Sequence, residues 1–391
     1  MEKENFNFAM RNMNLGTETA FTVLAKANKL ASEGKSIINL GIGQPDFPTP
    51  PHIVEAGIKA LKDGHHGYTQ SVGIPKLREA VSNDINKRHK VKVSPDNILI
   101  VPGGKVIIFF SAMIMGEKNR EILYPNPGFP IYESAINYSG ATAVPYKLSE
   151  EKGFSFSSEE ILNKINSKTS LIIINSPANP TGGIVPRSEL EKLAKGLDNF
   201  PNVTLMSDEI YDQFCFGSLP FTSMLSFPNI RDRLIILNGW SKTYAMTGWR
   251  LGYGIFPNKL YEIAEKLAVN IHSCVNASAQ YAALEALEGS QDCVSQMNNS
   301  FKRRASLMYN KLNEIEGFKC QEPKGAFYCF PNITATNKSS SIIQNELLDK
   351  LGVATVAGTS FGEFGEGFIR LSCASSDEAI EEAMNRIKTN F

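Results

Sequence analysis

The sequence lacks an excess of charge of either sign. Its 40 Lys and Arg residues balance 40 Asp and Glu residues, so the formal net charge is zero. A nucleic-acid partner favours a basic excess, and we therefore expect no nucleic-acid binding. No apolar run approaches the length of a membrane span, and residues 1–8 contain no apolar stretch typical of a secretory signal. We expect no membrane association and a cytoplasmic location.

Cysteine and histidine are scarce, with six and five residues in a chain of 391. The cysteines form no CxxC pair and are scattered between residues 215 and 373. This pattern indicates free thiols in a reducing compartment, with a structural disulfide as the less favoured alternative. His65 and His66 are adjacent, but a polar turn before Tyr68 explains them more simply than a metal site. No metal is therefore expected.

Short apolar runs alternate with helical patterns through the middle of the chain. Strands are predicted at 97–101, 121–124, 143–146, 171–175, 203–206, 234–237 and 250–256, and helices at 105–115 and 259–288. Such alternation predicts an α/β fold with a mostly parallel central sheet covered by helices on both faces.

The C-terminal part has a different pattern, in which polar helices accompany short strands at 325–330, 352–356 and 367–374. Near the N-terminus, apolar spacing over 21–31 predicts a helix. We therefore expect a large domain over residues 45–287 and a smaller α+β domain formed by both termini, residues 1–44 and 288–391.

Polar residues follow the predicted strands of the large domain. Asn179, Asp208, Tyr211 and Lys242 lie just after strand ends, where ligands bind in open α/β sheets. A lysine amine becomes nucleophilic when burial and a nearby cation lower its pKa, and Arg250 offers such a cation. Taken alone, Lys242 is better explained as an exposed surface lysine, and Asp208 as a helix N-cap.

Four motifs change this interpretation. They are SPANPTGG, SDEIY, SKTYAMTGWRLGY and FIRLSCA, which occur in this order between residues 176 and 374. Together they resemble the signatures of the fold type I, class I aminotransferases that depend on pyridoxal 5′-phosphate (PLP). The resemblance extends over about residues 21–386. It implies that the large domain binds PLP.

The resemblance also implies roles around the cofactor ring. Lys242 would hold PLP as a Schiff base, and Asp208 would keep the pyridine nitrogen protonated. Tyr211 and Asn179 would contact the phenolic oxygen, and Phe129 would stack on the ring where many relatives have Trp. Glu209, beside Asp208, is excluded from the carboxylate role by the resemblance alone.

Positions for the phosphate and the substrate follow in the same way. The backbone at Gly104 and Lys105, before a predicted helix, is a natural anion site, although Gly-Gly-Lys fits a plain turn equally well. Ser241 and Arg250 would add side-chain contacts to the phosphate. Gly43, Asn179 and Arg370 would contact the substrate α-carboxylate. Tyr68 would reach the phosphate of the partner subunit's cofactor, so the resemblance also implies a homodimer with shared active sites.

The implied function is transfer of an amino group from an L-amino acid to a 2-oxo acid by a ping-pong mechanism. Aspartate and 2-oxoglutarate are the leading substrates, because Lys105 matches a position that helps bind a distal carboxylate in some relatives. Glu18 would repel an acidic side chain or pair with Lys105, but a solvated charge ahead of the 21–31 helix is the simpler interpretation. A PLP-dependent β-lyase or C–S lyase is the alternative. A non-enzymatic aminotransferase-like regulatory module is disfavoured, since no basic DNA-binding segment is present.

Overall fold

The computed structural model describes residues 8–217 and 220–390. Its largest element is a seven-stranded sheet in the order β2-β8-β7-β6-β5-β3-β4. Neighbouring strands from β7 to β4 are parallel, whereas β8 runs antiparallel to both of its neighbours. The strands are β2 (Ile98–Val101), β3 (Glu121–Asn126), β4 (Thr142–Lys147), β5 (Thr169–Asn175), β6 (Thr204–Asp208), β7 (Leu234–Gly239) and β8 (Gly252–Ile255). The predicted α/β fold with a mostly parallel sheet is confirmed.

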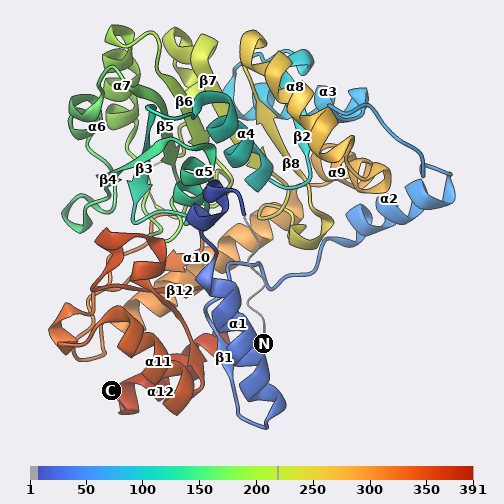
Figure 1. Cartoon of the computed structure of the whole chain (residues 1–391). Coiled ribbons are helices and arrows are strands. Elements are labelled where there is room, and N and C mark those ends of the chain that lie inside the picture. Colours follow the sequence, from blue (N-terminus) through green and yellow to red (C-terminus); the bar gives the residue numbers. More distant parts are fainter. Residues whose placement is uncertain (1–7, 218–219, 391) are drawn as a thin grey trace, which may run out of the picture.

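Helices cover both faces of this sheet (Figure 1). Successive strand residues point to opposite faces, so the apolar runs serve two cores. Ile172 and Ile174 of β5 belong to one core, and Leu171 and Ile173 belong to the other. The first core is shared with α2 (Pro51–Lys62), α3 (Pro75–His89), α6 (Ser158–Lys164), α7 (Arg187–Gly196) and α9 (Ala277–Glu288). The second is shared with α4 (Lys105–Met115), α5 (Ile131–Ser139) and α8 (Asn258–His272).

The helical stretch predicted at 259–288 is two helices, α8 and α9. The chain leaves helical geometry at Ser273, which has φ 58°, and the Asn276 side chain caps α9 by accepting from the Ala279 amide at 2.9 Å. Apolar spacing alone does not reveal such a break, because both helices keep an apolar face toward the sheet.

The two ends of the chain meet in a second cluster of elements. The parallel pair β1 (Ile38–Asn39) and β10 (Val353–Ala354) joins them, and β11 (Val356–Ala357), β12 (Ile369–Ser372) and β9 (Tyr328–Cys329) form a three-stranded sheet. The surrounding helices are α1 (Thr19–Ser32), α10 (Asp292–Leu312), α11 (Ser340–Leu351) and α12 (Asp377–Asn390). Within the described ranges no helix has the length and apolar character needed to cross a membrane.

Candidate active site

A cavity of about 470 Å³ lies at the carboxyl ends of β5, β6 and β7. Its wall also includes the start of α4, the segment before α1, and residues of β9 and β12. The cavity therefore brings together residues from the beginning, middle and end of the chain. Of the predicted site residues, Tyr68 alone does not line this cavity. The predicted residues that line it are Gly43, Gly104, Lys105, Phe129, Asn179, Asp208, Tyr211, Ser241, Lys242, Arg250 and Arg370.

Lys242 lies three residues after β7, and its side chain reaches into the cavity. Its Nζ donates a hydrogen bond to the Gly43 carbonyl at 2.6 Å. Burial, and then the charge of Arg370, lower the pKa of Lys242 to about 8. A Cβ on Gly43 would come within 2.1 Å of the Tyr328 hydroxyl, so only glycine allows this close approach. The amine is thus held in a setting that favours its neutral, nucleophilic form.

Asp208 ends β6 and is buried. Its Oδ2 accepts from the Tyr132 hydroxyl at 2.7 Å, and its Oδ1 accepts from the Ile210 amide at 3.1 Å. Burial raises the pKa of Asp208 to about 6, and the hydrogen bond from Tyr132 opposes this shift. The N-cap interpretation does not apply, because no helix starts here. Tyr132 was missed by sequence reasoning, although it lies one helical turn beyond Phe129 in the PNPGFPIYE segment.

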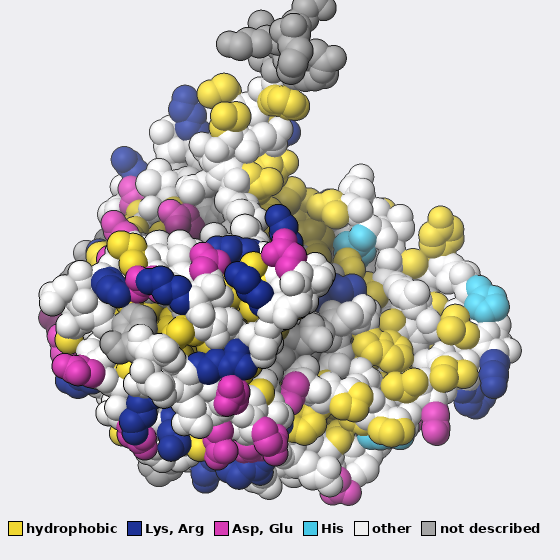
Figure 2. Space-filling model, turned by 90° about the horizontal axis from the view of Figure 1, so that it is seen from below, with side chains coloured by type: hydrophobic (Ala, Val, Ile, Leu, Met, Phe, Trp, Pro, Cys, Tyr) yellow, Lys and Arg dark blue, Asp and Glu magenta, His cyan; other side chains and the backbone are white. Residues whose placement is uncertain are grey.

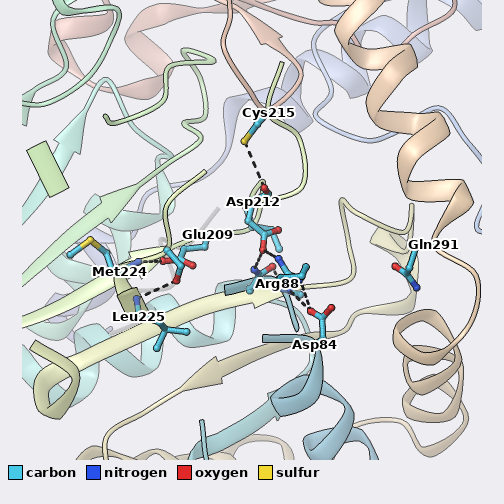
Figure 3. A network of polar contacts seen from close by, with 12 residues as sticks. Asp84, Arg88, Glu209, Asp212, Cys215, Met224, Leu225 and Gln291 are labelled. Atoms are coloured by element: carbon cyan, nitrogen blue, oxygen red, sulfur yellow. Dashed lines mark hydrogen bonds and ion pairs between the residues drawn. The ribbon is translucent and has the colours of Figure 1, made fainter. Parts of the chain in front are cut away.

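Glu209 turns away from the cavity. Its Oε1 accepts from the Ser207 hydroxyl and from the Met224 amide, both at 3.0 Å (Figure 3). The structure thus gives a physical reason for separating Glu209 from Asp208, because successive residues at the end of a strand point to opposite faces.

A separate ion-pair network anchors the segment that carries these residues. Arg88 of α3 contacts Asp212 at 2.6 Å and Asp84 at 2.7 Å (Figure 3). Asn238 of β7 donates a further hydrogen bond to Asp212 at 2.9 Å. This network ties the chain after β6 to α3 and β7, which fixes where Tyr211 lies.

Two tyrosine hydroxyls meet in the cavity wall. Tyr211 and Tyr328 are both buried, and their oxygens lie 2.8 Å apart. Tyr328, on β9, was also missed by sequence reasoning. The only signal for it was its place in the GAFYCF strand, where its neighbours are equally apolar. Burial raises the pKa of Tyr211, so its hydroxyl stays protonated at neutral pH and is available as a donor.

Arg370 of β12 is buried and lines the same cavity as Lys242. Its guanidinium donates to the Asn179 side-chain oxygen at 2.9 Å and to the Gly41 carbonyl at 2.5 Å. The rings of Tyr328 and Phe361 flank it at 4.6 and 4.7 Å from their centroids. Its Nε finds no hydrogen-bond partner among the described residues. A buried guanidinium with an unsatisfied donor on a cavity wall is suited to bind a carboxylate.

An anion cradle lies at the start of α4, where backbone amides and a positive helix end coincide. Gly103 has φ 94°, and a Cβ there would come within 2.2 Å of the Arg250 guanidinium. The absence of a side chain therefore lets Arg250 approach the backbone just before Gly104. Arg250 itself has φ 55°, and Ser241 is buried close to the same wall.

Glu18 forms an ion pair with Lys105, and only 14% of its side chain is exposed. The interpretation of Glu18 as a solvated charge is therefore wrong. The sequence could not decide this, because Glu18 and Lys105 are 87 positions apart and only the tertiary fold brings them together. The Lys105 ammonium also lies 5.7 Å from the centroid of the Phe129 ring.

Tyr68 does not line the cavity of its own chain. It lies between α2 and α3, and 91% of its surface is exposed.

Similarity to characterised families identifies the class of protein to which this fold and cavity belong. The chain is 38% identical over 386 residues to a probable aspartate/prephenate aminotransferase of Aquifex aeolicus, with 97% of each chain covered. It is 37% identical to an aspartate aminotransferase of Pyrococcus horikoshii, covering 92% of this chain and 91% of that one. The crystal structure of the aspartate aminotransferase from Rhizobium meliloti matches with a TM-score of 0.94, 30% identity and 98% coverage of both chains. The protein is a PLP-dependent transaminase.

A family model that matches most of the chain identifies the family. The family model described as aminotransferase class I and II matches residues 35–387. The chain belongs to the class I and II aminotransferases.

Proposed function

We propose that the cavity around Lys242 binds PLP and that Lys242 carries the cofactor through its Nζ. The observation that carries this assignment is an amine with a pKa of about 8, held at 2.6 Å from the Gly43 carbonyl in the same cavity as Asp208 and Arg370. The residues fit the cofactor, because a carboxylate, an amine and an anion cradle face one space.

Within this site we assign the remaining predicted contacts. Asp208 holds a proton on the ring nitrogen, since a carboxylate with two internal donors is fixed in position to accept from it. Phe129 covers the ring. The contacts to the phenolic oxygen and to the phosphate come from Asn179, Tyr211, Gly104, Lys105, Ser241 and Arg250.

PLP supplies an aldehyde that condenses with amines and a cationic ring that accepts the electron pair left at the substrate α-carbon. Arg370 and Asn179 bind the α-carboxylate beside the Gly43 backbone, which orients the Cα–H bond toward Lys242. The amino group of the substrate takes the place of Lys242 on the cofactor, which would free the lysine amine. The freed Nζ of Lys242 would then remove the α-proton as a general base, because its lowered pKa leaves part of the amine neutral near pH 7.

The amino acid and the 2-oxo acid use this one cavity in turn, so the kinetics are ping-pong. We propose aspartate as the leading donor and 2-oxoglutarate as the leading acceptor. Several relatives are named aspartate aminotransferases, which supports aspartate, and Lys105 offers a cation in the cavity for a second carboxylate.

We further propose a cytoplasmic homodimer in which Tyr68 reaches the partner's cofactor. The exposure of Tyr68 supports this, as do exposed apolar residues on α2 and α8. Figure 2 shows hydrophobic side chains gathered on the right half of one face and charged side chains crowding the left half. The exposed apolar residues on these two helices are Ile58, Leu61, Ile263, Val269 and Ile271. All six cysteines lie in the described ranges as free thiols, which agrees with a reducing compartment.

Residues 45–287 are proposed as the large domain, and residues 1–44 with 288–391 as the small one. The pairing of β1 with β10 supports this division, as does a common core that contains Leu40 and Val353. Residues 1–7, 218–219 and 391 of these ranges lie outside the described residues.

A half-reaction screen tests the assignment. Each amino acid is added to the purified PLP form, and the absorbance of the pyridoxal form is followed as the pyridoxamine form appears. Lys242→Ala is expected to abolish turnover, whereas Lys259→Ala, at an exposed position of α8, is expected to retain it. Turnover of Lys242→Ala at the wild-type rate would contradict the assignment. Pyruvate and ammonia formed without any acceptor would indicate a lyase instead.

A further inference from the structure

Glu18 precedes α1, and its side chain turns toward the active cavity. It is the N-cap residue of α1, and within the described part of the chain its side chain makes no capping hydrogen bond. Instead, the carboxylate turns inward and forms an ion pair with Lys105 at the start of α4. Its side chain is 14% exposed, compared with 42% for Lys105. Glu is not among the residues favoured as helix N-caps, so the ion pair with Lys105, and not the end of the helix, accounts for the position of this carboxylate.

The pair belongs to the wall of the active cavity. Glu18 and Lys105 line the same space as Lys242 and Arg370. Their charges act on the amine in opposite directions, because Glu18 raises the pKa of Lys242 and Lys105 lowers it. Any substrate that reaches Lys242 therefore lies within the field of this pair.

Among the described residues, the cations that line the cavity leave one place for a second carboxylate. The lysines and arginines that line it are Lys105, Lys242, Arg250 and Arg370. In the proposed function, Arg370 holds the α-carboxylate, Arg250 the phosphate and Lys242 the cofactor. Lys105 contacts the phosphate through its backbone, so its side-chain ammonium remains for the side-chain carboxylate of a dicarboxylic substrate. Glu18 already pairs with this ammonium.

We propose that Glu18 is a specificity-determining residue that competes with the side-chain carboxylate of an acidic substrate for Lys105. This inference rests on the proposed function. An acidic side chain must displace Glu18 or share one ammonium with it, and two adjacent carboxylates repel each other. A neutral side chain leaves the pair intact. It packs beside Phe21 and Phe129, whose ring centroids lie 5.5 and 5.7 Å from the Lys105 ammonium.

The first experiment measures binding without turnover. Succinate and 3-phenylpropionate are titrated into the PLP holoenzyme by calorimetry, because one carries a second carboxylate and the other an apolar group. Glu18→Gln keeps the shape and removes the charge. We expect it to tighten succinate by about five- to tenfold, as for a partly exposed ion pair, and to change 3-phenylpropionate by less than about twofold.

Two further variants separate the pair from general charge effects. Glu33→Gln removes the same charge from the far end of α1 and is expected to leave both affinities unchanged. In the Lys105→Met background, Glu18→Gln is expected to have no effect on succinate, because the contested cation is gone. Equal changes for both ligands, no change for either, or a gain that persists without Lys105 would each overturn the proposal.

Kinetics give the second readout. In the half-reaction, Glu18→Gln is expected to raise kcat/KM for aspartate relative to phenylalanine by about the same five- to tenfold factor. Failure of every amino acid to convert the wild-type PLP form would refute the proposed function. Conversion with an unchanged aspartate-to-phenylalanine ratio in the variant would refute only the role of Glu18.

Discussion

Replacement of Arg370 by lysine tests the substrate site most directly. The guanidinium is buried between two aromatic rings, and two of its nitrogens already bond to Asn179 and to the Gly41 carbonyl. A lysine keeps the charge but offers one ammonium, so it cannot keep these bonds and also bind a carboxylate through two parallel ones. The variant therefore separates charge from geometry.

The size of the effect follows from the bonds that are lost. One hydrogen bond between charged groups contributes about 1.5–3 kcal/mol. Since about 1.4 kcal/mol corresponds to a tenfold rate change, Arg370→Lys should lower kcat/KM by about 10- to 100-fold for every amino acid. The single-turnover half-reaction measures this value for alanine and aspartate. Arg304→Lys, at a buried arginine that pairs with Asp46 away from the cavity, is the matched control and should stay near wild type.

A substrate without the α-carboxylate decides the interpretation. 2-Aminopropane has the carbon skeleton of alanine without its carboxylate, so its slow reaction should be the same in wild type and Arg370→Lys. If the variant slowed 2-aminopropane as much as alanine, Arg370 would act on the shape of the cavity. The reasoning from carboxylate binding would then be refuted.

Three other predictions follow from the same site. Burial lowers the pKa of Lys242 to about 8, and the neutral amine is the nucleophile. The rate at which apoenzyme incorporates PLP, followed by absorbance, should therefore fall about tenfold per pH unit below pH 8 and level off above it. Tyr132→Phe removes a hydrogen-bond donor from buried Asp208, so kcat should fall by about tenfold. The acid limb of the pH profile of kcat should also move to higher pH, because this hydrogen bond lowers the pKa of Asp208. An unchanged pH profile would contradict this prediction. The Tyr68→Ala and Lys242→Ala variants should each be inactive alone. If Tyr68 serves the partner's site, a mixture of the two variants should regain up to about a quarter of wild-type activity through heterodimers that contain one intact site. No recovered activity in verified heterodimers would argue against a shared site.

The sequence alone was sufficient for the fold class. Apolar runs such as LIIIN at 171–175 are buried on both sides, and this requires a sheet covered on both faces. The motifs after the strand ends then located the cavity, because parallel strands direct their carboxyl ends to one edge. Local pattern and global topology agree at these positions, so no long-range information was needed.

Contacts between distant segments were decided only by the tertiary structure. The sequence placed Asp208 but not the Tyr132 hydroxyl that fixes it, and it placed Arg370 but not the Tyr328 and Phe361 rings around it. It also could not show that Glu18 turns from solvent to Lys105. The physical reason is the same in each case. A side chain's identity limits which partners it can bind, but the free energy of a charge or hydrogen bond depends on burial and distance, and these exist only once the chain has folded.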